Sequence, residues 1–407
     1  MFLGGLALLS LGGSRPALPR LRLALQPTEN IATASLSFEL VRKHILVDVQ
    51  INGSGSHACM VDNGFNTEVV TERAARAMGL QSHAAGGKTP NAKGLGEGPG
   101  PEIFVTEDSI VLGEKGSPLL TGHTLVLDMA ALEKELGHPF DCVIGAPLFA
   151  RFVVEIDFAN RCLTLYEPSG FAYRGQGHIV PLRVEVPPTV EAEVLAPDGR
   201  RVKATVGLDL GSDSVFDFRP SFQSKHHILQ PQQNEVMTGA IGLKGEFHTG
   251  VVRLPSVEFA GFRVEKPIAE FLEGSPDPHL SKNDGFVGNA LLERFNVIFD
   301  YSRHQVILDP NASFGDPFVA NMTGIGADAT SNPALGFDVK SLEGGSVAAT
   351  AGLQTGDRIV EINGVLCSTL TFESFHEMLT AEGAPFKLRV ERGGEKIEVS
   401  FQTPRLP

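Results

Sequence analysis

One motif occurs twice in this chain, and the repetition constrains the fold more than any other feature. In residues 141–157 and residues 284–300, the residues Asp, Gly, Leu, Arg, Phe and Asp recur in the same order and at the same spacing. The glycines of the two copies, Gly145 and Gly288, are 288 − 145 = 143 residues apart. An internal repeat of this kind predicts two similar structural units within one chain.

A hydrophobic stretch that ends in Asp-x-Gly precedes each copy of the motif. The two tripeptides are Asp62-Asn63-Gly64 and Asp209-Leu210-Gly211. Asp62 and Asp209 are 209 − 62 = 147 residues apart, which is close to the offset of the motif. Two carboxyls held against each other cannot both ionise, so they share one proton and can act as an acid–base pair. The repeat therefore predicts that each unit delivers one carboxyl to a common site.

This pattern resembles the pepsin and retropepsin-like aspartic proteases over roughly residues 38–312. The resemblance implies a mainly β fold with two similar β-barrel lobes, at residues 38–170 and 178–312, and it implies Asp62 and Asp209 as the catalytic pair. In such enzymes one carboxylate acts as general base on a water that attacks the peptide carbonyl, and the other carboxyl hydrogen-bonds the carbonyl oxygen. The resemblance implies no metal and no cofactor.

The two loops differ from those of the aspartic proteases at the residue after each aspartate. The family has a hydroxyl there, which bonds across to the other loop, whereas this chain has Asn63 and Leu210. The amide of Asn63 can donate and accept hydrogen bonds, but the side chain of Leu210 can do neither. Gly64 and Gly211 still allow a tight turn that leaves room for the carboxyls. Two hypotheses follow: an aspartic-type endopeptidase, or a catalytically degenerate protease fold that acts as a peptide-binding module.

The remaining features of the repeat are expected to have structural roles. Two glycine-rich stretches, residues 82–101 and 239–250, are expected to fold over the cleft between the lobes. Thr71 to Gly79 predicts a short helix with a threonine cap and a glycine end. The other repeated aspartates are expected to support the backbone, the last pair as turn formers; they are Asp141, Asp284, Asp157 and Asp300.

Residues 323–404 resemble a PDZ domain of the bacterial type. The resemblance rests on Leu335-Gly336-Phe337, which is similar to the carboxylate-binding loop, and on residues 345–364, which are similar to the following helix, turn and strand. Residues 371–379 have apolar positions at helical spacing. The resemblance implies that a peptide adds as a strand between this helix and the strand that starts at Phe337. Its terminal carboxylate would be held by the backbone amides of residues 335–337. The alternative is a groove that is filled internally.

Composition limits the partners of this protein. The formal net charge of −14 and the pI of about 5.3 argue against nucleic acid and anionic membranes. The expected partners are therefore polypeptide substrates, and protein C-termini bound in the PDZ groove. The apolar run at residues 2–13 is too short to span a bilayer and is typical of the core of a signal peptide. We therefore expect an export segment at residues 1–27 and a periplasmic or extracellular location.

The cysteines and histidines predict neither a redox motif nor a metal site. The four cysteines lack C-x-x-C spacing, and buried free thiols are the expected state; they are Cys59, Cys142, Cys162 and Cys367. A bridge between Cys142 and Cys162 stays open as an alternative. His226 and His227 have no partner cluster at metal-binding spacing, so we expect them to be surface or loop residues.

Overall fold

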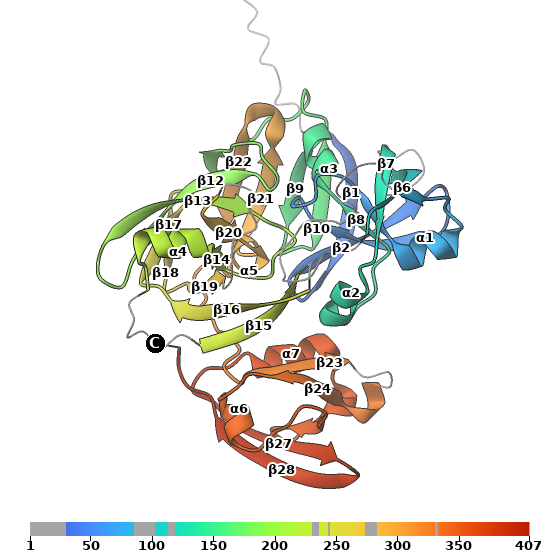
Figure 1. Ribbon diagram of the computed structural model, residues 1–407. Coiled ribbons are helices and arrows are strands. Elements are labelled where there is room, and N and C mark those ends of the chain that lie inside the picture. Colours follow the sequence, from blue (N-terminus) through green and yellow to red (C-terminus); the bar gives the residue numbers. More distant parts are fainter. Residues whose placement is uncertain are drawn as a thin grey trace, which may run out of the picture.

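The computed structural model describes residues 30–84, 102–112, 119–229, 236–242, 245–272, 283–329 and 333–406. These residues form a mainly β structure, with two sheets in the larger part of the molecule and a third sheet in the C-terminal part (Figure 1). The predicted export segment, residues 1–27, lies outside the described residues, and so do residues 85–101 of the first predicted cleft loop.

The first repeat, which we call lobe 1, extends from β1 to β10. β1 and β2 form a hairpin, and β2 pairs in turn with β3. The turn between β2 and β3 has positive φ at Asn52 (52°) and Gly53 (72°), as the hairpin signal of an Asn-Gly pair predicts. The strands are β1 (Ala32–Val41), β2 (His44–Ile51), β3 (Ser56–Val61), β4 (Val69–Thr71), β5 (His83–Ala84), β6 (Phe104–Val111), β7 (Leu119–Leu127), β8 (Cys142–Ile144), β9 (Val153–Asp157) and β10 (Cys162–Tyr166).

The second repeat, lobe 2, extends from β11 to β22. β12 and β13 form a hairpin, and β15 and β16 form another across the second predicted cleft loop. The strands are β11 (His178–Pro181), β12 (Thr189–Leu195), β13 (Arg201–Leu208), β14 (Phe216–Phe218), β15 (Val236–Gly242), β16 (Gly245–Arg253), β17 (Ser256–Phe259), β18 (Phe262–Glu265), β19 (Ile268–Leu272), β20 (Gly285–Val287), β21 (Phe295–Asp300) and β22 (Gln305–Pro310).

The two lobes repeat the same strand arrangement around their Asp-x-Gly loops. In lobe 1, β8 pairs parallel with β3 and antiparallel with β4, and β4 pairs parallel with β7. In lobe 2, β20 pairs parallel with β13 and antiparallel with β14, and β14 pairs parallel with β19. The strand of the duplicated motif, β8 or β20, therefore lies between the strands that precede and follow each loop. The sequence repeat is thus also a repeat of topology.

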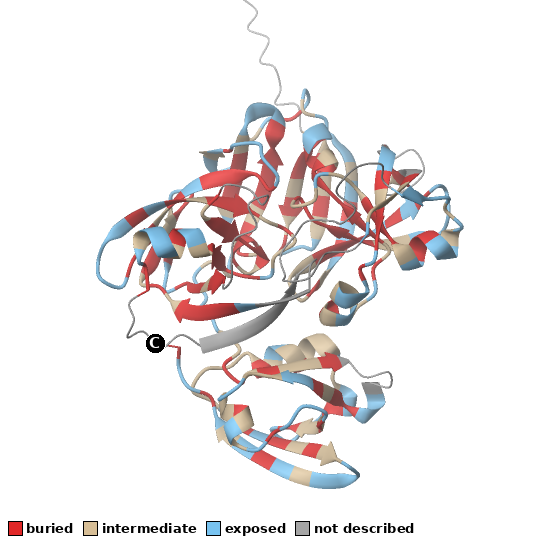
Figure 2. Ribbon diagram, in the orientation of Figure 1, coloured by how far each residue is buried: buried red, intermediate tan, exposed pale blue. Residues whose placement is uncertain are grey.

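A continuous sheet and a common core join the lobes. β9 of lobe 1 pairs antiparallel with β21 of lobe 2, so both belong to one 13-stranded sheet. Buried side chains from both lobes form one apolar cluster under this sheet, where the strands in Figure 2 are largely red. The rings of Phe149 and Phe299, for example, lie 5.3 Å apart across the lobes. Backbone pairing and core packing therefore both fix the lobes relative to each other.

The helices of the lobes are short. α1 (Glu72–Met78) has Thr71 as its N-cap and Gly79 in the left-handed conformation at its end, so this predicted helix is confirmed. Asp157 and Asp300 each accept a backbone N–H three residues ahead, which confirms their role as turn formers. The other helices are α2 (Ala130–Leu136), α3 (Ala146–Arg151), α4 (Pro220–His226), α5 (Asn289–Leu292) and the single 3-10 turn at Tyr301–Arg303.

The C-terminal domain has its own sheet and its own core. Phe337 and Phe375 stack with ring centroids 4.3 Å apart at the centre of that core. Thr371 and Ser374 form a capping box at the start of α7. Its elements are β23 (Ile325–Ala329), β24 (Phe337–Leu342), α6 (Val347–Thr350), β25 (Arg358–Ile362), β26 (Val365–Leu366), α7 (Phe372–Leu379), β27 (Pro385–Arg392) and β28 (Glu395–Gln402), with 3-10 turns at Pro333–Leu335 and Cys367–Thr369.

The C-terminal domain is attached to the lobes at both of its ends. Phe318, before the domain, and Leu406, after it, are buried in the apolar cluster of the lobes. Arg253 of lobe 2 also forms an ion pair with Glu382. In Figure 1, α7 and β23 face the lobes, whereas β27 and β28 lie on the far side. Of the helices in this domain, α7 is therefore the one directed toward the two lobes.

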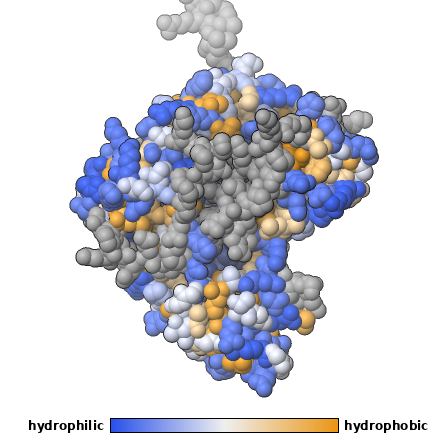
Figure 3. Space-filling view, viewed as in Figure 1, coloured by the Kyte–Doolittle hydropathy of each residue, from blue (hydrophilic) through white to orange (hydrophobic). Residues whose placement is uncertain are grey.

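The described part of the chain contains no helix long and apolar enough to cross a membrane. On the face drawn in Figure 3, the residues with colour are mostly hydrophilic and the hydrophobic patches among them are small and separate.

Candidate active site between the lobes

Two equivalent loops bring Asp62 and Asp209 to the boundary between the lobes. Each aspartate follows the last residue of a strand, β3 or β13. The N–H of Asp62 donates to the Ile144 carbonyl (3.0 Å), and the N–H of Asp209 donates to the Val287 carbonyl (2.9 Å). These acceptors belong to the two copies of the duplicated motif. The loops are therefore held by the same backbone contact in both repeats.

The glycines of the loops show how closely the two carboxyls approach. A Cβ atom at Gly211 would lie 2.2 Å from Asp62 Oδ2, so the carboxyl of lobe 1 reaches over the loop of lobe 2. A Cβ atom at Gly64 would lie 2.9 Å from Asp62 Oδ1 and 3.1 Å from Asp209 Oδ1. A side chain at either position would displace these carboxyls. Asp62 and Asp209 are thus brought together as the sequence predicts, and Gly64 and Gly211 make the room.

The surroundings favour one proton on the pair. Asp62 is 8% exposed, and burial, followed by the charge of Asp209, raises its pKa to about 8. Burial also raises the pKa of Asp209, but the N–H of Gly211 and the positive charges of His44 and Arg219 act against this rise. Burial therefore favours a shared proton on the pair, and the nearby donor and cations favour the ionised form at Asp209.

Asn63 bonds the first loop to the second. Its Nδ2 donates to the Leu208 carbonyl (3.0 Å), and its Oδ1 accepts from the N–H of Leu210 (3.0 Å). One buried amide therefore makes both a donated and an accepted bond across the lobe boundary. The Asn63 amide therefore both donates and accepts a hydrogen bond to the other loop, as the sequence predicts that it can.

Leu210 forms hydrogen bonds in the second loop through its backbone alone. Its side chain is fully buried in the common apolar core. Its carbonyl accepts from Asn289 Nδ2 (2.7 Å), the residue that follows Gly288 in the motif. The corresponding residue of lobe 1 is Ala146, which has no such donor. Asn289 is not among the predicted site residues, although its place directly after the motif glycine is a usable signal.

A second group of buried acids lies in lobe 2 beside the pair. Asp217 on β14 accepts from Ser214 Oγ (2.7 Å) and Ser212 Oγ (3.1 Å), and burial raises its pKa to about 7. Burial, with the charge of Asp217, raises the pKa of Glu270 on β19 to about 8. Neither acid is marked in the sequence, because each is an ordinary strand residue; only the fold places Asp217 near Asp209 and Glu270 near Asp217.

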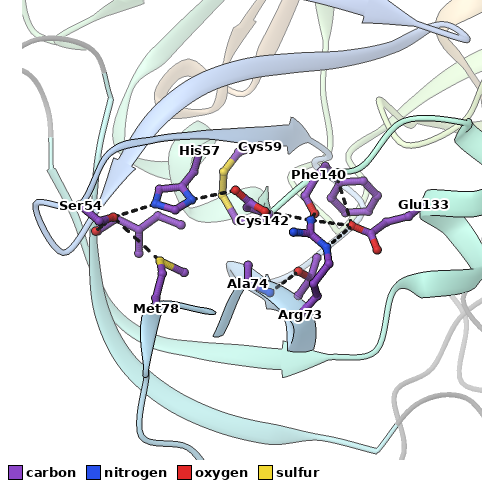
Figure 4. Close-up of polar contacts among 12 residues, drawn as sticks. Ser54, His57, Cys59, Arg73, Ala74, Met78, Glu133, Phe140 and Cys142 are labelled. Atoms are coloured by element: carbon purple, nitrogen blue, oxygen red, sulfur yellow. Dashed lines mark hydrogen bonds and ion pairs between the residues drawn. A yellow bond between two sulfur atoms is a disulfide. The ribbon is translucent and has the colours of Figure 1, made fainter. Parts of the chain in front are cut away.

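A disulfide crosslinks the strands behind the first loop, which corrects the expectation of free thiols. Cys59 on β3 and Cys142 on β8 are bonded and directly opposite each other in the parallel pair (Figure 4). Cys162 and Cys367 are free, so the alternative bridge between Cys142 and Cys162 is wrong. The pairing follows from topology, because β3 and β8 are neighbours despite a sequence separation of 83 residues.

A polar network surrounds this disulfide and supports the loop. His57 Nδ1 lies 2.8 Å from Asp141 Oδ2, and His57 Nε2 lies 2.7 Å from Ser54 Oγ (Figure 4). The Ser54 hydroxyl also donates its single proton to the Ile51 carbonyl, so it is not held for transfer to the imidazole. Arg73 further pairs with Asp141 at 2.9 Å. We therefore interpret the network as structural support, which agrees with the role expected for Asp141.

The structure changes the strand to which a peptide could add in the C-terminal domain. β24, which starts at Phe337, pairs on one side with β25 and on the other with β23, where Ala329 lies opposite Phe337. No edge of β24 is therefore free beside α7, and the prediction of peptide addition there is wrong. Gly336 packs against β25, because a Cβ atom would lie 2.2 Å from the Ile359 carbonyl oxygen, and Leu335 is 51% exposed. The edge strand next to α7 is β23.

Among the residues that the structure describes, no group of three or more His, Cys, Asp or Glu side chains is arranged to hold a metal ion. His226 and His227 lie at the end of α4, where Arg200 donates to the carbonyl oxygens of both (2.9 Å each). These two histidines therefore end a helix.

Comparison with known protein families concerns the C-terminal domain. A family model described as PDZ domain matches residues 339–392, from within β24 to the end of β27. No curated protein matches the chain. The matched residues contain α7, whose apolar positions at helical spacing were expected from the sequence. The C-terminal part of this chain therefore contains a PDZ domain, a module that binds peptides.

Proposed function

We propose that this protein is an aspartic-type endopeptidase whose PDZ domain binds the peptide chains to be cleaved. The observation that carries the proposal is the approach of two carboxyls, Asp62 and Asp209, from equivalent loops of an internal repeat. The resemblance of the repeat to aspartic proteases supports the same reading. Paired carboxyls that share a proton are suited to hydrolysis by an activated water.

In the proposed mechanism, Asp209 is the general base and Asp62 carries the shared proton. Asp209 takes a proton from water while the water oxygen attacks the peptide carbonyl carbon, and the Asp62 O–H hydrogen-bonds the carbonyl oxygen as negative charge develops there. The C–N bond then breaks, and the leaving amine takes a proton from the pair. Asp209 is assigned as the base because it is the more exposed of the two and lies closer to positive charge.

The proposed PDZ groove lies between β23 and α7. A peptide that adds antiparallel to β23 would place its C-terminus beside the start of that strand, at Ile325. The terminal carboxylate would then meet the turn at residues 321–324 rather than Leu335 and its neighbours. Gly324 has a φ of 73°, which only glycine adopts readily, so this turn is sharply bent at the required end.

We also propose that the protein works outside the reducing cytosol. The Cys59–Cys142 disulfide supports this proposal, because disulfides form and persist in oxidising compartments. The apolar run at residues 2–13 supports an export segment in the same way.

The alternative is a peptide-binding protein on a degenerate protease fold. The observation that favours it is the buried apolar side chain of Leu210, in a loop where the resembling enzymes have a hydroxyl. Under this alternative the PDZ domain and the space between the lobes would hold peptides without cleaving them.

Peptide cleavage tests the proposal directly. The purified protein is incubated with a complex peptide mixture from pH 3 to pH 8, and new termini are identified by mass spectrometry. The variants Asp62→Asn and Asp209→Asn are compared with wild type after circular dichroism has shown that they fold. We expect cleavage that each variant lowers by at least about a thousandfold. Cleavage retained in both variants, or none in wild type at any pH, would contradict the proposal.

A further inference from the structure

The tip of the β1–β2 hairpin joins three parts of the molecule. It contacts the PDZ domain, lobe 2 and the second Asp-x-Gly loop. The contacts are Arg42 N–H to Glu373 Oε2 on α7 (2.8 Å), Lys43 Nζ to Glu293 Oε1 of lobe 2 (2.7 Å), and His44 Nε2 to the Gly211 carbonyl oxygen (3.2 Å).

The backbone of this tip is held in an unfavourable conformation. Arg42 and Lys43 both have positive φ, at 44° and 68°. Two-residue hairpin turns of this type are usually formed by Asn and Gly, because a larger side chain strains the backbone there. The Arg42 guanidinium hydrogen-bonds Glu135 and lies 6.0 Å from the centre of the Phe372 ring. Contacts with lobe 1 and with α7 therefore hold the turn in place.

His44 lies between two carbonyl oxygens. Its Nδ1 is 2.8 Å from the Arg42 oxygen, and its Nε2 is 3.2 Å from the Gly211 oxygen. A carbonyl oxygen only accepts hydrogen bonds, so both contacts are hydrogen bonds only when both ring nitrogens carry a proton. A neutral imidazole carries one proton and can satisfy only one of them. The geometry therefore fits an imidazolium ring.

These contacts form a continuous chain from the PDZ helix to the candidate catalytic carboxyl. Glu373 accepts from the Arg42 N–H, and the Arg42 carbonyl accepts from His44. His44 in turn donates to the Gly211 carbonyl, and the Gly211 N–H donates to Asp209 Oδ1 (3.0 Å). The hydrogen bonds that connect α7 with the Asp209 loop therefore pass through the His44 side chain.

The charges around His44 make its own charge matter for Asp209. The cations of the hairpin tip already have partners, since Arg42 pairs with Glu135 and Lys43 pairs with Glu293. The positive charge of His44 favours the ionised form of Asp209. Among the described residues, the titratable and charged groups that face this junction include Arg42 and Lys43 of the hairpin, Asp62 and Glu135 of lobe 1, Asp209, Asp213, Arg219 and Glu293 of lobe 2, and Glu373 and His376 of α7.

We propose that His44 is a positioning residue for the reaction, whose doubly protonated ring ties the Asp209 loop to the hairpin tip that docks on the PDZ helix. The inference rests on the proposed function, because it assigns His44 a role in that reaction. It also makes a claim about hydrogen bonding that can be tested without turnover.

The activity test compares His44→Gln, His44→Lys and the matched control His83→Gln, at an exposed histidine, in the full-length protein. The measurements are kcat/KM from pH 4 to pH 8 and the Tm of each variant. We expect His44→Gln to lose about tenfold in kcat/KM, and its acid-side limb to move to higher pH because Asp209 has lost a nearby cation. His44→Lys keeps the positive charge and should return the acid-side limb of the pH profile to its position in wild type. A profile of His44→Gln that matches wild type would overturn the proposal.

The second test measures the hydrogen bond of His44 to the Gly211 carbonyl and needs no turnover. Wild type and His44→Gln are labelled with ¹³C at glycine carbonyls and ¹⁵N at serine, which restricts the observed peptide groups to Gly-Ser pairs, and a Ser212→Ala variant identifies the signal of Gly211–Ser212. We expect the Gly211 carbonyl signal of wild type to shift with the same pH midpoint as the His44 ring, and that shift to be absent in His44→Gln. A Gly211 signal that does not follow the ring overturns the inference. If the signal follows the ring but no peptide is cleaved, the proposed function fails and the hydrogen-bond assignment holds.

Discussion

Asn63 connects the lobes through both ends of one buried amide. Asn63→Leu removes the bonds to Leu208 and Leu210 and leaves a buried carbonyl and a buried N–H without partners. Each unsatisfied group costs about 1–3 kcal/mol, so we expect the free energy of unfolding to fall by at least about 2 kcal/mol. Urea denaturation measures the change.

Asn63→Thr is the comparison that separates hydrogen bonding from packing. A threonine hydroxyl can still donate to the Leu208 carbonyl or accept from the Leu210 N–H. We expect a smaller loss of stability than in Asn63→Leu. Equal stability of both variants and wild type would show that the bonds across the lobe boundary contribute little.

Asp62 makes folding stability depend on pH. Its pKa is about 8 in the folded protein, against about 3.9 in an unfolded chain. Between these values the folded state binds more protons than the unfolded state, so the free energy of unfolding falls as the pH rises from about 4 to about 8. Asp62→Asn removes this term. We expect the variant to exceed wild type in stability by at least about 1 kcal/mol at pH 8, and by little at pH 4.

Asp48→Asn, at an exposed position of β2, is the control for the change of charge. It should leave the pH dependence of wild type unchanged when Tm is followed from pH 4 to pH 8. The buried carboxyls of Asp217 and Glu270 act in the same direction as Asp62, so part of the slope should survive in Asp62→Asn. A slope identical to that of wild type would mean that Asp62 is ionised in the folded protein at neutral pH.

At this scale the sequence predicts residues that belong to the repeat and misses those that depend on tertiary placement. Asp62 and Asp209 could be found because duplication marks them. His44 carries no such mark, since its role depends on a loop 167 residues away. Asp217 likewise reads as an ordinary strand residue until the fold places it near Asp209.

At the scale of elements, the Cys59–Cys142 disulfide fixes the β3–β8 pair behind the first loop. Removing it with Cys59→Ala/Cys142→Ala opens a crosslink between residues 83 apart in sequence. In the chain-entropy description a loop of this length contributes about 4.5 kcal/mol, so we expect a corresponding fall in the free energy of unfolding. Cys162→Ala is the control, because Cys162 is free. Insensitivity of wild type to reducing agent would argue against the bond.

Local signals predict most elements around the site, but they do not predict their neighbours. The Asn52-Gly53 turn and the capped helix α1 follow from residues adjacent in sequence. β23 was missed because it is short and follows a polar linker. Its pairing with β24 then changes which edge lies beside α7. The disulfide was missed for the same reason, since strand order rather than cysteine spacing decides which thiols meet.

At the scale of the whole molecule, the PDZ helix packs against the lobes, and nothing in the sequence predicts this contact. Burial and the positive charge of Arg42 lower the pKa of His376 on α7 to about 4, which reflects the contact. Lys134 of α2 pairs with Asp328 of β23 at 3.3 Å. Lobe 1 therefore touches both elements of the proposed peptide groove. A peptide that enters the groove has to compete with these contacts.

Gly137→Ala should weaken the docking of the PDZ helix on lobe 1. A Cβ atom at Gly137 would lie 2.4 Å from the Phe372 ring of α7, so this ring has to shift and its packing on lobe 1 is disturbed. If docking limits access to the groove, the fraction of molecules that can bind rises, and the apparent Kd for a peptide falls in proportion. We expect Kd to fall at least about threefold, as measured by fluorescence anisotropy with peptides that bind wild type. Hydrogen exchange at residues 372–379 should rise at the same time.

Gly79→Ala is the matched control for this last change. Gly79 and Gly137 both end short helices in the left-handed conformation, with φ of 67° and 68°. Alanine therefore strains the backbone equally at the two sites. A Cβ atom at Gly79 meets nothing within 4 Å, so only Gly137→Ala disturbs the contact with Phe372. If both variants bind peptide as wild type does while exchange rises only in Gly137→Ala, the contact exists but does not restrict the groove.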